Sequence, residues 1–468
     1  MTFYSGNPDD TIAAIATPPG IGAIAVLRIS GPEAFTIADL VFKSPGGKTK
    51  ISAALSHTAY FGTIVNDDRI IDEVLATVFR NPKSFTGEDT VEFSCHGSPY
   101  IQKEILNLLI EKGARLAQPG EFTLRAFLNK KMDLTQAEAV GDLIAADSAA
   151  AHQVAMKQMR GGFSREIHEL RERLIHFASL LELELDFAEE DVEFANRGQL
   201  LQLIDETLYQ TKKLSASFEA GNVIKTGIPV VIAGKPNVGK STLLNLVLNE
   251  DRAIVSDIAG TTRDTIEEEI TLAGMKYRFI DTAGIRDTVD TIELIGVGRS
   301  MEKIQEASVI IYLFDPGETA PENLTEILNA IIESKSGDKY VLIPVANKSD
   351  RYNLEYLTDL YSDVPDVIFI SAKAHKGIND LFDRITSVVT HSNIGANDVI
   401  LTNARHKAMM DKTTEALDNA RKGLTTSLPT DLVAIEIRSA LMYLGEITGE
   451  ITTDDLLTNI FSRFCIGK

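Results

Sequence analysis

Cysteines, basic residues and long apolar runs are all scarce in this chain of 468 residues. Only two cysteines are present, Cys95 and Cys465, which excludes a disulfide framework and a thiolate-rich zinc site and is typical of a reducing compartment. The longest apolar stretches, such as residues 309–314, are far shorter than the roughly 20 residues that span a bilayer. The amino terminus carries Asp9 and Asp10 and no basic segment before an apolar core. We therefore expect a soluble, cytoplasmic protein with no secretory signal and no membrane partner.

The shortage of basic residues also argues against non-specific binding of nucleic acid over the whole protein surface. The chain has 46 Lys and Arg against 67 Asp and Glu, a net charge of −21. Non-specific affinity for nucleic acid comes mostly from Lys and Arg that neutralise phosphates. A local basic patch, or a basic partner docked on the acidic body, leaves RNA binding open. The composition, with 44% apolar and 24% charged residues, is typical of a globular protein that can bury a large core. The length predicts two to four domains.

The first 125 residues alternate short apolar runs with turn signals, which predicts a small α+β domain over residues 1–125. We expect strands at residues 11–16, 23–29, 73–79 and 90–93 and a helix at residues 101–110.

Beyond Pro119 and Gly120 the pattern becomes helical. Between residues 134 and 214, apolar side chains recur at three- and four-residue spacing, and residues 402–464 show the same spacing. One example is the series Ile167, Leu170, Leu174, Phe177 and Leu181. Neither block makes an obvious domain alone, so we predict one discontinuous helical bundle from residues 126–222 and 389–468.

Strands and helices alternate in the intervening residues 223–388. Short, nearly continuous apolar runs occur at residues 229–233, 277–280, 308–314, 340–345 and 367–370. Such runs suit parallel strands that are buried on both faces. We predict an inserted α/β domain, and insertion is physically easy because the termini of a domain often lie close together.

A phosphate-binding loop pattern follows the first of these runs. Residues 234–241 read Gly-Lys-Pro-Asn-Val-Gly-Lys-Ser, after a predicted strand and before a helical run. Glycines let the backbone approach phosphates, and the amides at the start of a helix point at them. Lys240 would neutralise the β- and γ-phosphate oxygens, and Ser241 would bind magnesium.

Two further segments complete the predicted magnesium and γ-phosphate site. Asp281 follows an apolar run and would reach the magnesium ion through water, while Gly284 would contact the γ-phosphate. Thr262 would supply a second hydroxyl ligand to magnesium from the loop at residues 260–264.

Two more segments identify the base as guanine. In the sequence Asn-Lys-Ser-Asp at residues 347–350, the Asp350 carboxylate can accept both hydrogens from the guanine edge, whereas adenine would leave it unpaired. Ser371, Ala372 and Lys373 follow the next strand and would complete the base pocket. The order and spacing predict a Ras-like GTPase domain. The predicted GTP-binding residues are Asn237, Val238, Gly239, Lys240, Ser241, Thr242, Ser256, Asp257, Ile258, Ala259, Gly260, Thr261, Thr262, Asp281, Thr282, Ala283, Gly284, Asn347, Lys348, Asp350, Ser371, Ala372 and Lys373.

The hydrolytic step departs from that of many small GTPases. Ile285 occupies the position where those proteins place a Gln that orients water. The acid–base candidates in the following segment are Asp287, Asp290 and Glu293, each of which can also be a solvated loop carboxylate. Arg263, Arg286 or a bound cation would stabilise the transition-state charge, and the amide oxygen of Asn237 could hold a monovalent ion.

The flanking segments resemble the MnmE/TrmE family of tRNA-modification GTPases over the whole chain. The resemblance is carried by Thr-Pro-Pro-Gly at residues 17–20, Ser-Phe-Thr-Gly-Glu-Asp at 84–89, Pro-Gly-Glu-Phe-Thr at 119–123 and Phe-Cys-Ile-Gly-Lys at 464–468. These flanking motifs make the match specific, because other GTPases share the motifs of the nucleotide site. The family binds a folate, and the resemblance favours a carboxyl-terminal tail docked beside that folate over prenylation of Cys465, since Lys468 is a poor final residue for a prenylation box.

The resemblance implies a homodimer formed through the amino-terminal domains, each binding a tetrahydrofolate derivative (5-formyl- or 5,10-methylene-tetrahydrofolate) as one-carbon donor. It implies a flavoprotein partner of the MnmG/GidA type in a heterotetramer, and addition of an aminomethyl or carboxymethylaminomethyl group to carbon 5 of the tRNA wobble uridine. The residues that match the folate positions are Arg28, Glu92, Lys131 and Lys468.

The resemblance also implies GTP hydrolysis activated by potassium. Asn237, Ser256, Ile258 and Thr261 match the potassium site, and Glu293 matches the carboxylate that positions water. The predicted catalytic residues are therefore Glu293, which would position water, and Arg286, a candidate for stabilising the transition-state charge.

Two other readings remain. A regulatory GTPase of ribosome assembly would share the nucleotide motifs and lack one-carbon chemistry, and a nucleotide-driven clamp would leave all chemistry to its partner. For the adjacent Cys95 and His96, structural packing is favoured over a nucleophile and base, because neighbours on a strand point to opposite faces.

Overall fold

The structure is a computed structural model that describes residues 10–47, 49–186, 197–249, 254–255, 268–280, 304–335, 340–390, 399–426 and 428–468. Its contacts divide the chain into two compact units. Unit 1 comprises Met1–Ile144, Ala155–Thr211 and Met409–Lys468, and unit 2 comprises Ala145–Val154 and Lys212–Ala408. The four domain ranges expected from the sequence stay a prediction.

The amino-terminal part of unit 1 is built on a seven-stranded sheet in the order β3-β4-β5-β6-β2-β1-β7. The strands are β1 Ile12–Ile15, β2 Ile24–Ser30, β3 Phe42–Lys43, β4 Thr58–Asn66, β5 Arg69–Phe79, β6 Thr90–His96 and β7 Arg115–Leu116. The helices are α1 Ala34–Val41, α2 Pro99–Glu111 and α3 Glu121–Leu128, with short 3-10 helices at Pro45–Gly47 and Ile51–Ala53. All four expected strands and the expected helix are present here, whereas β4 was not expected.

Alternation along these strands decides which face is buried. In β6, Val91, Phe93 and Cys95 are buried, and Glu92, Ser94 and His96 lie on the opposite face because successive side chains alternate. The buried face packs with residues of α1 and α2, among them Ile37 and Ile105. The other face is left for the residues that form the amino-terminal candidate site.

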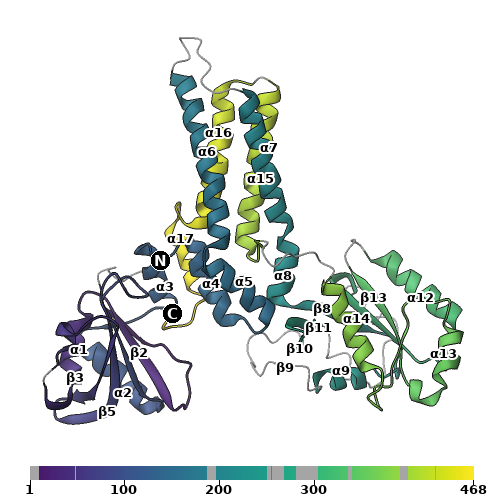
Figure 1. Cartoon of the computed structure of the whole chain (residues 1–468), viewed down its shortest axis with the longest axis horizontal. Helices are drawn as coiled ribbons and strands as arrows, with labels where there is room; N and C mark the ends of the chain where they lie inside the picture. The colour runs from purple at the N-terminus through teal and green to yellow at the C-terminus, as the bar shows by residue number, and fades with distance from the viewer. Residues whose placement is uncertain are drawn as a thin grey trace. The chain divides into compact units, whose positions relative to one another are not determined.

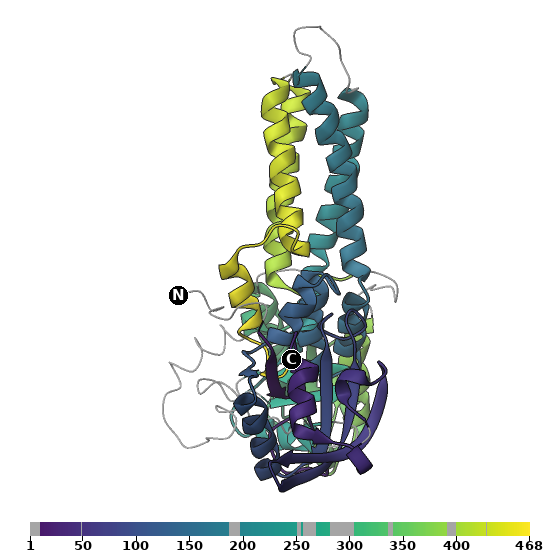
Figure 2. The same ribbon diagram turned by 90° about the vertical axis from the view of Figure 1, so that its left-hand side faces the viewer.

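Unit 1 also contains the helical segments on either side of unit 2 in the sequence. Helices α6, α7, α15 and α16 run side by side in both views (Figures 1 and 2). The predicted series from Ile167 to Leu181 is buried, as the helical spacing indicated. The helices in these segments are α4 Leu134–Ala145, α5 Ala149–Met159, α6 Gly162–Asp186, α7 Arg197–Ala216, α15 Ala404–Thr425, α16 Thr430–Thr448 and α17 Asp454–Phe461. Residues 149–154 of α5, 212–216 of α7 and 404–408 of α15 are assigned to unit 2. Among the described residues, no helix combines the length and apolar character that a membrane span requires.

Unit 2 is an α/β fold around a second seven-stranded sheet, in the order β14-β13-β12-β8-β11-β10-β9. The strands are β8 Ile228–Ala233, β9 Ile254–Val255, β10 Glu268–Leu272, β11 Met275–Phe279, β12 Val309–Phe314, β13 Val341–Ala346 and β14 Ile368–Phe369. The helices are α8 Phe218–Thr226, α9 Lys240–Leu248, α12 Pro321–Ser334, α13 Leu354–Leu360 and α14 Ile378–Thr390, with a 3-10 helix at Ser349–Arg351.

The five strands expected to be parallel are parallel. β8 lies between β11 and β12, β12 pairs with β13, and β13 pairs with β14, all in parallel register. Every residue of β12 is buried, which explains its unbroken apolar sequence. The predicted architecture is confirmed: an amino-terminal α+β part, a helical part split in sequence, and an inserted α/β part.

Candidate functional site

The phosphate-binding loop connects β8 to α9 at the carboxyl edge of the parallel sheet, where ligands of open α/β sheets bind. Two glycines of this loop are required both because a side chain would clash with neighbouring atoms and because their φ angles are positive. A Cβ on Gly234, whose φ is +148°, would lie 2.1 Å from the carbonyl oxygen of Leu313. A Cβ on Gly239, whose φ is +102°, would lie 2.4 Å from the side-chain nitrogen of Asn347. The loop is therefore packed directly against the ends of β12 and β13.

Lys240 begins α9 and turns back over this loop. Its Nζ donates to the carbonyl oxygens of Gly234 at 2.7 Å and Lys235 at 2.9 Å. Burial lowers the pKa of the Lys240 ammonium below its ordinary value. Ser241 and Thr242 follow in the first turn of α9, half-buried and exposed respectively. An ammonium and a hydroxyl at a helix start form the arrangement that holds phosphates and a magnesium ion.

Asn347 connects two of the predicted motifs through its buried side chain. Its Nδ2 donates a 2.8 Å hydrogen bond to the carbonyl oxygen of Val238, and its Oδ1 accepts a 3.0 Å hydrogen bond from the Ala372 amide. Asn347 is only 4% exposed, so water cannot easily replace these two hydrogen bonds. The phosphate-binding loop and the 371–373 loop are thus held by one amide group.

Asp350 and Ser371, two residues predicted to recognise the base, contact each other directly. Ser371 Oγ donates to Asp350 Oδ1 at 2.5 Å and accepts from the Ala374 amide at 3.1 Å. The hydrogen bond from Ser371 lowers the pKa of the Asp350 carboxyl and so favours its ionised form. Lys373 is exposed beside it. A fixed carboxylate of this kind suits the two hydrogens of the guanine edge.

Asp315 is a residue of this site that the sequence reasoning missed. It follows β12, is 3% exposed, and its Oδ2 lies 2.8 Å from the Nζ of Lys348. Although burial alone would raise its pKa, hydrogen bonds from Lys348 and the Gly317 amide lower it. The available signal was its position, an acidic residue immediately after a predicted strand. Asp315 fixes the direction of the lysine beside the predicted guanine pocket.

Several predicted residues lie outside the described part of the chain, and their structural roles stay predictions. They are Ser256, Asp257, Ile258, Ala259, Gly260, Thr261, Thr262, Asp281, Thr282, Ala283, Gly284, Arg286 and Glu293, together with the alternatives Arg263, Asp287 and Asp290.

The second candidate site lies on the face of the amino-terminal sheet opposite the core shared with α1 and α2, next to Phe122 of α3. Arg28 on β2 and Glu92 on β6 are directly opposite each other, and the guanidinium of Arg28 donates to Glu92 Oε1 at 2.8 Å. The guanidinium carbon lies 5.5 Å from the ring centre of Phe85 and 5.4 Å from that of Phe122. Both charged side chains are partly exposed, at 19% and 26%, so a ligand can reach them.

The other two predicted folate residues border the same region. Lys131 Nζ donates to the carbonyl oxygen of Pro82 at 2.9 Å, which connects the segment after α3 to the loop that carries Phe85. Lys468 follows Gly467, which packs so closely on β1 that a Cβ would lie 2.3 Å from the Ile15 carbonyl oxygen. Since β1 pairs with β2, the tail ends on the strand next to Arg28. All four predicted residues therefore belong to adjoining segments.

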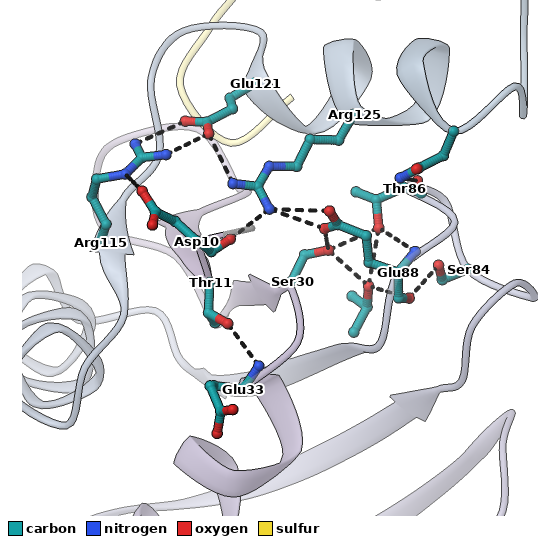
Figure 3. A network of polar contacts seen from close by, with 12 residues as sticks. Asp10, Thr11, Ser30, Glu33, Ser84, Thr86, Glu88, Arg115, Glu121 and Arg125 are labelled. Carbon is teal, nitrogen blue, oxygen red and sulfur yellow. Dashed lines mark hydrogen bonds and ion pairs between the residues drawn. The ribbon is translucent and has the colours of Figure 1, made fainter. Parts of the chain in front are cut away.

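A buried ionic network adjoins this site (Figure 3). Arg125 Nη1 donates to both carboxylate oxygens of Glu88, at 3.1 and 3.2 Å, and Nη2 donates to Glu121 at 3.1 Å. Glu121, 2% exposed, also accepts two hydrogen bonds from Arg115. Burial alone would raise the pKa of Glu121, but hydrogen bonds from Arg115 and from the Gln118 amide lower it. Sequence reasoning did not find this network, since its members are separated by up to 115 residues.

Cys95 and His96 do not form a nucleophile and base. Cys95 is buried, which raises the pKa of its thiol to about 11, and His96 lies on the exposed face with its Nδ1 2.7 Å from Asp72 Oδ1. The packing interpretation is confirmed.

Two family models match the chain. Residues 134–465 match the model described as the MnmE helical domain, and residues 11–131 match the model described as the GTP-binding protein TrmE N-terminus. The matches cover unit 1 on both sides of unit 2 in the sequence.

Curated proteins are similar over nearly the full length. A protein of Flavobacterium psychrophilum named tRNA modification GTPase MnmE is 53% identical over 98% of this chain and 99% of that protein. Proteins of the same name from Cytophaga hutchinsonii and Porphyromonas gingivalis are 54% and 49% identical, over 99% and 100% of this chain and 98% and 100% of theirs.

Proposed function

The chain belongs to the MnmE family of tRNA modification GTPases, and we propose that it uses GTP hydrolysis to drive modification of carbon 5 of the tRNA wobble uridine. The observation that carries the nucleotide half of this proposal is the set of contacts around Asn347. One buried amide joins the phosphate-binding loop at Val238 to the base loop at Ala372. This arrangement holds the predicted phosphate loop and the predicted base loop next to each other.

The donor set fits magnesium. Ser241 offers a hydroxyl at the start of α9, beside Lys240, and Thr262 is the proposed second ligand. Magnesium would neutralise charge on the β- and γ-phosphates, while Lys240 binds the same oxygens. Asp350 would accept hydrogen bonds from guanine, and Lys348, held by Asp315, would lie beside it.

Potassium is proposed as the activating cation. Asn237 is exposed in the phosphate-binding loop with a φ of +62°, so its amide is available to a cation beside the phosphates. Ser256, Ile258 and Thr261 are the other proposed ligands, with Glu293 positioning water and Arg286 near the transition-state charge. A cation there would supply the charge stabilisation that an arginine finger gives in related enzymes.

The proposed donor of the one-carbon unit is a tetrahydrofolate derivative bound at Arg28 and Glu92. The Glu92 carboxylate suits the amide-like edge of a pterin, and cations such as Lys131 and Lys468 suit the glutamate tail. The guanidinium of Arg28, with Phe85 and Phe122 near it, offers a mixed polar and aromatic surface. The protein's own part is to bind and orient this donor.

The proposed partners are a second copy of the chain, tRNA, and a flavoprotein of the MnmG/GidA type in a heterotetramer. Support for a dimer through the amino-terminal part comes from two exposed apolar residues on the folate face. Phe61 and Leu75 are cross-strand partners, 53% and 47% exposed, one row from Thr77 and Glu92.

Two measurements on the full chain test the proposal. GTP turnover is expected to be higher in potassium than in sodium at equal ionic strength, and 5-formyltetrahydrofolate is expected to bind by calorimetry. Glu92→Gln should weaken folate binding and leave GTP turnover unchanged. A preference for ATP would contradict the nucleotide assignment, and GTP turnover with no folate binding would favour a regulatory GTPase of ribosome assembly.

A further inference from the structure

Helix α3 and the residues that flank it contact several segments of the proposed folate site. Just before it, Pro119 forms an isolated bridge with Ile466, and the Gly120 amide donates to the Cys465 carbonyl oxygen at 3.3 Å. Just after it, Asn129 Nδ2 donates to the Thr86 carbonyl oxygen at 2.8 Å. The helix thus joins the carboxyl-terminal tail at one end to the loop of residues 81–89 at the other.

Arg125 makes the corresponding connection from the middle of this helix. Its guanidinium is 5% exposed and reaches three partners at once: the Glu88 carboxylate, the Glu121 carboxylate and, at 2.7 Å, the carbonyl oxygen of Asp10. The donors of a guanidinium are spread over three nitrogens in one rigid plane, so it can hold acceptors that lie apart, whereas the three donors of an ammonium radiate from a single nitrogen. The position of α3 is therefore tied to the 81–89 loop by a group with little freedom.

Glu88 carries this connection into the sheet (Figure 3). Its Oε2 accepts a 2.7 Å hydrogen bond from Ser30 Oγ, and Ser30 lies 2.8 Å from Thr86 and 3.2 Å from Thr90, hydroxyl to hydroxyl. Ser30 and Thr90 face each other on β2 and β6, one same-face row from the pair of Arg28 and Glu92. The ionic network is thus hydrogen-bonded to the row of the sheet next to Arg28 and Glu92.

We propose that Arg125 and Glu88 are positioning residues for the proposed folate site, and this inference rests on the proposed function. Neither residue belongs to the set Arg28, Glu92, Lys131 and Lys468. The buried pair fixes the 81–89 loop, the tail and the strands of the binding pair relative to one another. Losing it would loosen Phe85 and the Lys131 segment while each binding side chain is still present.

The primary test is Arg125→Lys in the full chain, which retains the charge and removes the planar fork. We expect affinity for 5-formyltetrahydrofolate to fall about 10-fold or more, because a lysine cannot reach Glu88, Glu121 and Asp10 together. Ile105→Val is the matched control, since Ile105 is fully buried under the sheet and contacts none of the network. Equal weakening by both variants would mean general destabilisation and would overturn the proposal, as would unchanged affinity in Arg125→Lys.

A double variant separates positioning from stability. Arg125→Gln leaves the partly buried Glu88 carboxylate without its partner, so stability should fall. Adding Glu88→Gln should recover part of the lost stability because the uncompensated charge is removed. Folate affinity should stay low in the double variant. Recovery of affinity together with stability would overturn the positioning role.

Amide hydrogen exchange, measured on the full chain without ligand, tests the positioning role even if folate does not bind. Arg125→Lys is expected to speed amide exchange in residues 81–89 and 463–468 and to leave β4 and β5 protected. Exchange unchanged in both segments would overturn the proposal. If the wild-type chain binds no folate while exchange changes as expected, the proposed function fails and the positioning of these segments stands.

Discussion

The side-chain amide of Asn347 lies 2.8 Å from the carbonyl oxygen of Val238, across 109 residues of sequence. The same amide accepts a hydrogen bond from Ala372, so one side chain sets the spacing between the loop for the phosphates and the loop for the base. The distance between base and phosphates is a fixed property of a nucleotide. A site that sets this spacing in advance has less to reorganise on binding.

Replacing Asn347 with Ala should therefore weaken GDP binding, although all charged residues of the predicted site are retained. The variant leaves a buried carbonyl and a buried amide unpaired, each costing about 1–3 kcal/mol. We expect a loss of about 10- to 100-fold in affinity, measured with a fluorescent GDP analogue.

Asn353→Ala is the matched control for this variant. Asn353 caps α13 in the same unit, where its side chain accepts from the Glu355 amide. Its removal should cost about 1 kcal/mol of stability and leave GDP affinity within about twofold. Equal losses in the two variants would contradict the linking role of Asn347.

Asp350→Asn should change which base is accepted. The carboxylate accepts two hydrogens from guanine, whereas an amide offers one acceptor and one donor, which matches the N–H and carbonyl of xanthine. We expect GTP affinity to fall by about 100-fold or more and XTP affinity to rise. Competition binding of GTP, XTP and ATP measures this, and retained selectivity for GTP would show that another group reads the base.

How far the sequence predicted this site depends on how local each signal is. Lys240, Asp350 and Ser371 belong to short motifs at fixed distances from apolar strands, and the described ones lie together as expected. Asp315 was missed because a single acidic residue after a strand carries no motif. Its meaning depends on Lys348, which folding brings within 2.8 Å.

The fold shows the same limit. The parallel strands of unit 2 are continuous apolar runs, so composition alone located them. β4 was not predicted because its pattern is mixed: Phe61 is exposed, and Gly62 lies under Phe42, where a Cβ would be 2.4 Å from the ring. The need for glycine there comes from a neighbouring strand and is invisible in local periodicity.

Gly234→Ala should abolish nucleotide binding and destabilise unit 2. The new methyl group would lie 2.1 Å from the Leu313 carbonyl oxygen, and the backbone has a φ of +148°. Overpacking and a disfavoured conformation together should cost about 3 kcal/mol or more. Thermal unfolding and GDP binding measure the two effects.

Gly20→Ala separates these two causes. Gly20 has a similar φ of +132°, but a Cβ there would meet nothing within 4 Å. This variant should therefore show the cost of conformation alone. A destabilisation as large as that of Gly234→Ala would mean that contact with Leu313 contributes little.

The buried carboxylate of Glu121 should make the stability of unit 1 depend on pH. Its pKa in the folded chain lies below the ordinary value of 4.5, since Arg115 and Arg125 hydrogen-bond the ionised form and outweigh burial. The unfolded state therefore binds a proton first as pH falls. The stabilisation is complete above the ordinary value and is lost as pH drops through the folded pKa.

The measurement is urea unfolding of the wild type and of Glu121→Gln at a series of pH values. Their difference in unfolding free energy should be constant from about pH 6 to 8 and should shrink below pH 4.5. Glu104→Gln is the control, because Glu104 pairs with the exposed Arg69 in the same unit and its removal should have a smaller effect throughout. If the difference for Glu121→Gln grew as pH fell, the folded pKa would have to be raised, and the ionised network around Arg125 would be wrong.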